Sequence, residues 1–522
     1  MASVAPPMAE PAIARPGVSV PSVSLLGRDL TASIVVFLVA MPLCMGIAIA
    51  SGVPAEKGLI TGIIGGLVVG ALAGSPLQVS GPAAGLAVIV YELVRDQGLS
   101  ALGPILVVAG AVQVAAGVFR LGGWFKAISP AVVHGMLAGI GVLIVVGQFH
   151  VLFDHRPLPS GLQNLAAVPG RLLGLSPSNL QATEFAFGIG VATILAMLGW
   201  EKYRPATLRL LPGALVGVVV GTLLALVLGL DVARVQVPDS IVAAVTPPSG
   251  DAFARLLDPA VIAAAVAIAF IASAETLLSA AAVDKMHGGV RTDYNKELRA
   301  QGVGNLLCGF AGALPMTGVI VRSSANVQAG AATRLSAILH GAWILGFVAA
   351  LPFVLTMIPM AALGAILVVT GFRLVSVKHA THLFRDYGVL PVLIWAATLI
   401  MVVSTDLLTG VLVGIGLTML ELVPNLHRLR LRVYEETQDE THAITLDGTA
   451  TFVTLPRLSE TLDRVPAGTA VHIDATRLDA VDHTSAEMLR DWFQRRRAAG
   501  HPVTISGARG RIATLDEDHS KS

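Results

Sequence analysis

An arginine and two serines interrupt an apolar part of the chain. The stretch LPMTGVIVRSSANVQAG (314–330) contains Arg322, Ser323 and Ser324, and apolar runs lie on both sides of it. A charge at membrane depth costs at least about 2.5 kcal/mol, so it usually faces a bundle interior or a watery cavity. A guanidinium beside hydroxyl donors suits a small oxyanion. The stretch therefore predicts an anion site at Arg322, with an interfacial arginine that reaches lipid headgroups as the alternative.

A carboxylate interrupts a second apolar run. Glu275 lies near the middle of AIAFIASAETLLSAAAVDK (267–285), and Ser279 follows four residues later. Residues four apart share one face of a helix. A carboxylate held inside a membrane can bind H⁺ or Na⁺, or it can pair with a cation such as Arg322. A coupling-ion site and a structural ion pair both stay open for Glu275.

The composition of the chain indicates to which class of protein it belongs. The chain has 522 residues, of which 54% are hydrophobic and 13% are charged, and its mean hydropathy is +0.75. Such a chain is too apolar for an ordinary soluble domain, and its net charge of +1 gives no sign of a nucleic-acid surface. Cys44 and Cys308 lie in apolar segments and are predicted to be reduced and inert. Residues 1–28 are rich in Pro, Ala and Ser, which predicts a disordered tail rather than a signal peptide.

Apolar runs along the chain predict 14 membrane segments. Most of them approach the roughly 20 residues that a bilayer-spanning helix requires, and four are short or broken. The segments lie near 30–51, 58–74, 80–94, 102–119, 131–152, 183–200, 211–230, 259–283, 299–313, 316–328, 334–356, 359–372, 388–403 and 406–424.

The basic residues between the segments predict the orientation. With the N-terminus inside, the inside loops would hold most of the Lys and Arg residues, which is the usual bias of membrane proteins. These inside residues are Arg120, Lys126, Lys202, Arg204, Arg209, Lys285, Arg291, Lys296, Arg299, Arg373, Lys378 and Arg385. The chain is therefore expected to cross the inner (plasma) membrane several times, with both termini in the cytoplasm.

Two of the short segments resemble one another. The run VSGPAAGLAVIVYELV (79–94) holds only about 15 helical residues, or about 22 Å, which is too short to cross the membrane. The stretch 314–330 is its counterpart in the second half. Interrupted segments in corresponding halves point to a transporter site between inverted repeats. Half-helices that start near Gly81 and Thr317 would direct free N–H groups and positive dipole ends at an anion.

The composition changes after Pro424. Residues 426–440 are predicted to be a linker, and 441–522 a small cytoplasmic domain. Within it, 442–453 and 469–476 have the pattern of strands, 482–500 that of an amphipathic helix, and 502–507 that of a further strand. Alternation of strand and helix predicts an α/β fold.

Several stretches resemble the SulP (sulfate permease) family of anion transporters. These are DLTASIVVFLVAMPLCMGIAIASGVP (29–54), SGPAAG (80–85), NKELRAQGVGNLLCGFAGALP (295–315) and IVRSSANVQAG (320–330). The resemblance covers about residues 28–425. It implies a polytopic α-helical protein whose transmembrane domain, residues 29–425, has two inverted seven-helix repeats that form a core and a gate domain. The C-terminal part is similar to the STAS domain of that family. The Arg322 motif of this chain is similar to that of bacterial members that are linked to carbonic anhydrase. This similarity implies that bicarbonate is the transported anion.

The resemblance also assigns roles to particular residues. It implies that the anion contacts Arg322 and Ser323 and the start of the third segment, with two first-helix residues facing the pocket. Glu275 matches a carboxylate that sodium-coupled members use for the cation, with Ser279 in place of a threonine. The other implied substrate-binding residues are Gly81, Ala83, Ala84, Leu43 and Ile47. His340 is predicted to be packed rather than functional.

The stretch DATRLDAVDHTSAEML resembles a segment of anti-sigma-factor antagonists that carries a phosphorylatable serine. His483 follows Asp482 where that serine would be. Thr484 and Ser485 could accept phosphate, but helix capping is the expected role of this segment. A regulatory or assembly role is therefore predicted for the domain.

These observations predict a secondary active transporter of a small inorganic anion, bicarbonate or sulfate, coupled to Na⁺ or H⁺, and not an enzyme. No cofactor is expected beyond the coupling ion. A homodimer, contacts with membrane lipid and a link to carbonic anhydrase are expected partners. The alternatives are a dicarboxylate/H⁺ symporter, a nucleobase carrier, an uncoupled exchanger or channel, and an anion sensor with the STAS-like domain as its output.

Overall fold

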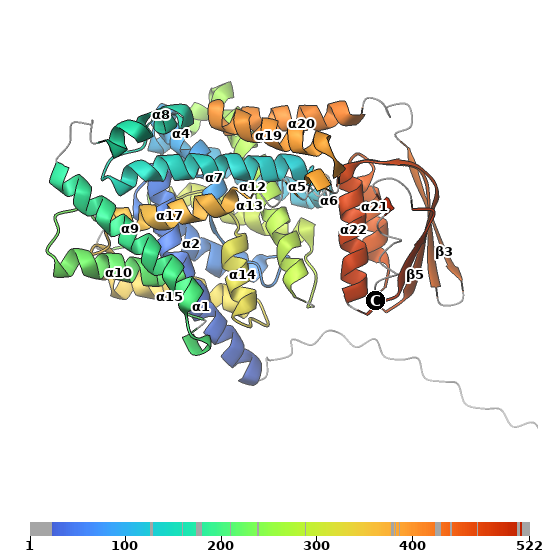
Figure 1. The fold of residues 1–522 in the computed structure, drawn as a ribbon, viewed down its shortest axis with the longest axis horizontal. Helices are drawn as coiled ribbons and strands as arrows, with labels where there is room; N and C mark the ends of the chain where they lie inside the picture. The colour runs from blue at the N-terminus through green and yellow to red at the C-terminus, as the bar shows by residue number, and fades with distance from the viewer. Residues whose placement is uncertain are drawn as a thin grey trace, which may run out of the picture.

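A helical bundle and a small α/β unit make up the protein (Figure 1). The α/β unit lies at one end of the bundle, and α8 (Gly161–Leu172) lies at the opposite end. The structure is a computed structural model. It describes residues 23–125, 129–158, 160–173, 180–208, 210–236, 240–287, 289–376, 381, 383–385, 387–422, 430–438, 441–466, 468–498, 500–508 and 512–513.

Each of the 14 predicted apolar segments coincides with a helix within these described ranges. The helices of the bundle are α1 (Val23–Ala50), α2 (Ala55–Ile64) continued by η1 (Gly65–Val69) and α3 (Gly70–Leu72), η2 (Ala84–Leu86) with α4 (Ala87–Gln97), α5 (Leu99–Val118), α7 (Pro130–Leu152), α9 (Leu180–Tyr203), α10 (Gly213–Val227), α12 (Pro259–Met286), α13 (Tyr294–Ala311), α14 (Ile320–Gln328), α15 (Leu335–Ala350), α17 (Met360–Leu374), α19 (Val389–Ser404) and α20 (Leu407–Leu422). Short connecting helices are α6 (Gly122–Phe125), α11 (Gly250–Ala254) and α16 (Pro352–Leu355).

Length and apolar composition make most of these helices suitable for a membrane. Six of them contain a stretch of at least 18 residues that is long and apolar enough to cross a bilayer. Five shorter apolar helices accompany them. Because a helix satisfies its own backbone hydrogen bonds, it is the element that an apolar solvent permits.

The two interrupted segments meet as strands before their helices begin. β1 (Ser80–Pro82) pairs antiparallel with β2 (Met316–Gly318), and Gly81 lies directly opposite Thr317. The helices themselves begin three residues after the predicted starts near Gly81 and Thr317, at Ala84 and Ile320. The strand pairing satisfies backbone groups that would otherwise be unpaired at this depth.

Helix α1 begins earlier than the sequence predicts. It starts at Val23, so residues 23–28 are helical rather than part of the predicted tail; residues 1–22 lie outside the described residues. Contacts with the α14–α15 connection hold this end of the helix. The Asp29 carboxylate accepts hydrogen bonds from Ala332 N (2.7 Å) and from the Thr333 N and Oγ1 atoms (3.0 and 2.6 Å). Arg28 Nε donates to the Gly330 carbonyl (3.0 Å).

The α/β unit is a four-stranded mixed sheet in the order β3-β4-β5-β6. Its elements are β3 (Leu431–Gln438), β4 (Thr441–Ala450), α21 (Leu455–Arg464), β5 (Ala470–Val481), α22 (His483–Ala498) and β6 (Val503–Ser506). The predicted linker 426–440 is wrong over residues 431–438, which form the edge strand β3. The stretch LRVYEETQ is polar because one face of an edge strand meets water. Residues 423–429 and 439–440 lie outside the described part of the chain.

The α22 helix begins where the α/β unit touches the bundle. The N-terminal cap is Asp482, whose Oδ1 accepts from Ser485 N (2.7 Å) and whose Oδ2 accepts from Phe452 N (2.6 Å). Burial raises the pKa of the Asp482 carboxyl. The next residue, His483, makes a buried hydrogen bond between its Nε2 and Ser129 Oγ at the start of α7 (2.7 Å). This contact joins the α/β unit to the bundle.

Candidate anion site

Arg322 is the largest side chain that is fully buried among the described residues. It lies in the first turn of α14, and its Nε, Nη1 and Nη2 atoms have no hydrogen-bond partner within the described chain. A Cβ atom added to Gly81 would collide with Arg322 Nη1. The guanidinium therefore lies directly against β1, where only a glycine leaves room for it. Interfacial snorkelling, the alternative for Arg322, does not occur in this structure.

Ser323 connects the two interrupted segments. Its Oγ accepts a hydrogen bond from Val79 N (2.9 Å) and donates to the Val319 carbonyl (2.7 Å). Val319 N donates to the Val79 carbonyl (2.9 Å). The hydroxyl of Ser323 is therefore bonded within the protein, and it positions α14 against β1.

Glu275 approaches the same segment from α12. A Cβ atom added to Gly85 would lie 2.7 Å from Glu275 Oε2 and 2.9 Å from Oε1. Arg322 and Glu275 thus lie against opposite ends of the segment from Gly81 to Gly85. Glu275 Oε2 has no hydrogen-bond partner in the described chain, and neither do the three Arg322 nitrogens, so the two charges do not pair here. Ser279 is buried one helical turn from Glu275.

The paired strands β1 and β2, residues 80–82 and 316–318, are called the crossing below. The other predicted residues are apolar and lie on the elements around it. Ala83 is buried between β1 and η2, and Ala84 is half-buried at the start of η2. Leu43 and Ile47 are buried on α1. Helix α1 contacts both β1 and α14. Every predicted substrate-binding residue therefore lies on β1, at the start of η2, on α14, or on the helix α1 that contacts β1 and α14.

Two polar groups near Arg322 were not assigned to the site from the sequence. The Cys44 thiol on α1 and the His340 ring on α15 lie within electrostatic range of the guanidinium. His340 Nε2 and Thr317 Oγ1 are buried without hydrogen-bond partners among the described residues. Cys44 follows Leu43 directly, which is the one sequence signal that could have placed it at the site. Nothing in the sequence indicates that α15 brings His340 here.

One face of α13 supports both strands. Glu297, Gln301 and Asn305 are spaced four residues apart and are fully buried, so they form one row along the helix. Gln301 Nε2 donates to Ser80 Oγ on β1 (2.6 Å) and to Glu297 Oε1 (3.0 Å). Glu297 Oε2 accepts from Ser75 N (2.9 Å).

The end of this row holds β2. Asn305 Oδ1 accepts from Met316 N (2.8 Å), and its Nδ2 donates to the Met316 carbonyl (3.1 Å) and to Gln113 Oε1 on α5 (2.7 Å). From the other side, Thr276 Oγ1 accepts from Gly318 N (3.1 Å). The stretch NKELRAQGVGN therefore supplies the side chains of α13 that position β1 and β2.

We expect Asn305→Ala to reduce anion uptake about tenfold or more. The substitution leaves Met316 N buried without a partner, which costs about 1–3 kcal/mol of the free energy of unfolding and releases β2. Uptake per folded protein and the midpoint of thermal unfolding are measured together.

A matched control is Asn164→Ala. The Asn164 amide bonds both backbone groups of Leu158 (2.8 and 2.9 Å) at the far end of the bundle. This variant should lose similar stability and keep most of its uptake. Equal loss of uptake in both variants would contradict a specific role of Asn305 at the crossing.

Comparisons with known proteins identify the family of the chain. The family model described as the sulfate permease family matches residues 26–398. Two relatives are YvdB of Bacillus subtilis (strain 168), 31% identical over 74% of this chain and 72% of the relative, and the bicarbonate transporter BicA of Picosynechococcus, 24% identical over 80% of this chain and 74% of the relative.

Two solved structures have the same fold. The transmembrane domain of a cyanobacterial BicA aligns with a TM-score of 0.61 at 23% identity, over 75% of this chain and 98% of that chain. Murine Slc26a9 in its inward-facing state aligns with a TM-score of 0.66 at 16% identity, over 96% of this chain and 88% of that chain. The predicted fold class, a polytopic helical bundle with a C-terminal α/β domain, is confirmed. The chain belongs to the sulfate permease family, whose members are membrane anion transporters.

Proposed function

We propose that the chain is a secondary active transporter that binds a small inorganic oxyanion at Arg322. The observation that carries this proposal is a fully buried guanidinium without a hydrogen-bond partner in the described chain, placed against Gly81. A buried charge costs several kcal/mol unless it is paired. An anion between the starts of η2 and α14 would supply that pair, and the N-termini of both helices would favour its charge.

The charge balance favours a monovalent anion and a coupled cation. Arg322 and Glu275 contribute opposite charges that do not pair with each other. One cation at Glu275 and Ser279 leaves a net charge of +1, which one monovalent anion neutralises. We therefore favour bicarbonate with Na⁺ or H⁺ over the divalent sulfate. Among the relatives, BicA is named as a bicarbonate transporter, whereas the name of YvdB refers to sulfate.

Transport would require the site to face each side of the membrane in turn. Helices α1, α4, α12 and α14 carry the site, and α5 and α13 pack together beside them. A second group contains α7, which packs against α17, α19 and α20. We propose that the first group moves against the second as core and gate. This motion, the cytoplasmic termini, a homodimer and a link to carbonic anhydrase stay predictions.

Uptake into proteoliposomes tests the proposal. Purified full-length protein is reconstituted, and radiolabelled bicarbonate and sulfate are supplied separately, each with and without an inward Na⁺ or H⁺ gradient. We expect bicarbonate uptake to be several-fold faster with one of the two gradients, because the cation at Glu275 must bind for the charge to balance.

The six combinations of anion and gradient separate the alternatives. Gradient-dependent sulfate uptake without bicarbonate uptake would contradict the charge argument and retain the site. An uptake rate that depends on neither gradient would favour the uncoupled exchanger or channel. Uptake of neither anion would turn attention to dicarboxylates or to the sensor hypothesis.

A further inference from the structure

The hydroxyl of Thr317, on β2, is buried and available for a ligand. The residue is fully buried, and its Oγ1 atom has no hydrogen-bond partner within the described chain. We propose that this hydroxyl is a second anion ligand, which binds an oxygen of a small oxyanion whose other oxygens bind the guanidinium of Arg322. This inference rests on the proposed function of Arg322 and adds a residue to that site.

The strand register sets the direction of the Thr317 side chain. Thr317 lies directly opposite Gly81 in the antiparallel pair of β1 and β2. The side chains of directly opposed residues point to the same face, with their Cβ atoms about 5 Å apart. A Cβ atom added to Gly81 would collide with Arg322 Nη1. The Thr317 side chain therefore lies on the face of the crossing that the guanidinium covers.

Contacts on the other face of the crossing agree with this direction. Successive residues of a strand point to opposite faces, so the neighbours of Gly81 and Thr317 point away from the guanidinium. Ser80 Oγ accepts from Gln301 Nε2 on α13 (2.6 Å), and a Cβ atom added to Gly304 of α13 would lie 2.6 Å from Met316 Sδ. Helix α13 therefore covers the face of the crossing opposite to Thr317.

The spacing suits an anion that joins the two side chains. Hydrogen bonds of about 2.8 Å on either side of a bridging oxyanion span about 5–7 Å. The opposed Cβ positions lie about 5 Å apart, and the one at Gly81 falls against the guanidinium. The nitrogens of Arg322 and Thr317 Oγ1 all lack partners in the described chain, so they do not bond each other. An oxyanion between them would satisfy both groups.

The two groups also complement each other chemically. A guanidinium only donates hydrogen bonds, and its fork matches two oxygens of one anion. A hydroxyl both donates and accepts, so Thr317 can bond a third oxygen whether or not that oxygen carries a proton, as one oxygen of bicarbonate does. The ligand class is therefore a small oxyanion with at least three oxygens, rather than a carboxylate with two.

The experiment measures binding without transport. The thermal unfolding midpoint of purified full-length protein is titrated separately with sodium bicarbonate, sodium sulfate and sodium formate, because a ligand stabilises the state that binds it. Formate has a C–H bond in place of a third oxygen, so it can fill the fork of Arg322 without bonding the hydroxyl. We expect Thr317→Val to raise the half-maximal concentration of the bound oxyanion about tenfold or more, and that of formate less than about twofold.

Further variants separate binding from structure. Thr317→Ser keeps the hydroxyl and should bind the oxyanion nearly as wild type does. Without an anion, Thr317→Val should unfold at the same temperature or a higher one, because it removes a buried hydroxyl that has no partner.

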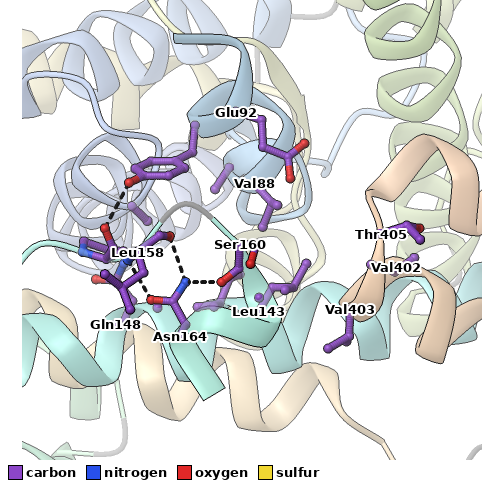
Figure 2. A pocket seen from close by; sticks show the side chains of 17 residues that line it. Val88, Glu92, Leu143, Gln148, Leu158, Ser160, Asn164, Val402, Val403 and Thr405 are labelled. Atoms are coloured by element: carbon purple, nitrogen blue, oxygen red, sulfur yellow. Dashed lines mark hydrogen bonds between the residues drawn. The ribbon is translucent and has the colours of Figure 1, made fainter. Parts of the chain in front are cut away.

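A matched control is Thr405→Val. Thr405 lines a separate cavity between α4, α7, the chain before α8, and α19, which Figure 2 shows. The lining of that cavity includes neither Arg322 nor a residue of the crossing. Thr405 Oγ1 already donates to the Met401 carbonyl (2.6 Å), so this variant should bind the anions as wild type does.

The outcomes distinguish this inference from the proposed function. Oxyanion binding that requires Arg322 but is unchanged in Thr317→Val would overturn the inference and leave the proposed function standing. Equal weakening of formate, loss of binding in Thr317→Ser, or a large fall in the unfolding temperature of anion-free Thr317→Val would overturn it in the same way. No shift with either oxyanion in wild type, or a shift that persists in Arg322→Leu, would overturn the anion site and this inference with it.

Discussion

Replacing Arg322 by leucine is expected to abolish anion uptake without destabilising the fold. The guanidinium is fully buried and has no partner in the described chain, so in the absence of an anion it costs free energy rather than contributing it. Leucine fills part of the volume and carries no charge. Uptake should fall to the level of empty liposomes, while the free energy of unfolding stays the same or rises.

Two further variants sharpen this test. Arg322→Lys keeps the charge but loses the planar donor array, so uptake should stay strongly reduced. Arg255→Leu is the matched control, because the exposed Arg255 donates through Nη1 to the Gln97 carbonyl at the end of α4; its uptake should remain. A large loss of stability in Arg322→Leu, or normal uptake, would show that Arg322 has a structural role instead.

Replacing Glu275 by glutamine is expected to remove the response to a cation gradient. The carboxylate lies against Gly85 with one oxygen unpartnered among the described residues. Glutamine has nearly the same shape but can neither bind a proton at neutral pH nor balance a Na⁺ ion. Gradient-driven accumulation should fall at least about tenfold, since the charge of the bound anion is then balanced by Arg322 alone.

Accumulation and exchange are measured separately in the same liposomes. Exchange of labelled for unlabelled anion needs no net cation movement, and it should persist in Glu275→Gln if the anion site is intact. Glu201→Gln is the matched control, because Glu201 pairs with Arg373 outside the crossing. If Glu275→Gln accumulates anion as wild type does, the coupling role is wrong and the carboxylate serves only the packing of α12.

Hydropathy along the sequence was sufficient to predict the class of protein and the positions of its membrane segments. Each of the 14 apolar runs coincides with a helix in the described ranges, because every membrane helix must satisfy its own backbone hydrogen bonds locally. The strands and the second helix of the α/β unit also follow local patterns. The edge strand β3 was missed, since its polar residues have the composition of a linker.

The sequence also identified Arg322 and Glu275 as candidate site residues, because a charge in apolar surroundings costs free energy and is therefore rare. Only the tertiary structure determined how they are arranged. Gly81 pairs with Thr317 across more than 200 residues of chain, Asn305 holds β2, and Ser323 bonds Val79 instead of remaining free. The placement of Cys44 and His340 near Arg322, and the separation of Arg322 from Glu275, depend on the packing of both halves of the bundle. Such contacts leave no periodic pattern in either segment, because they depend on how distant parts of the chain pack together and not on the local sequence.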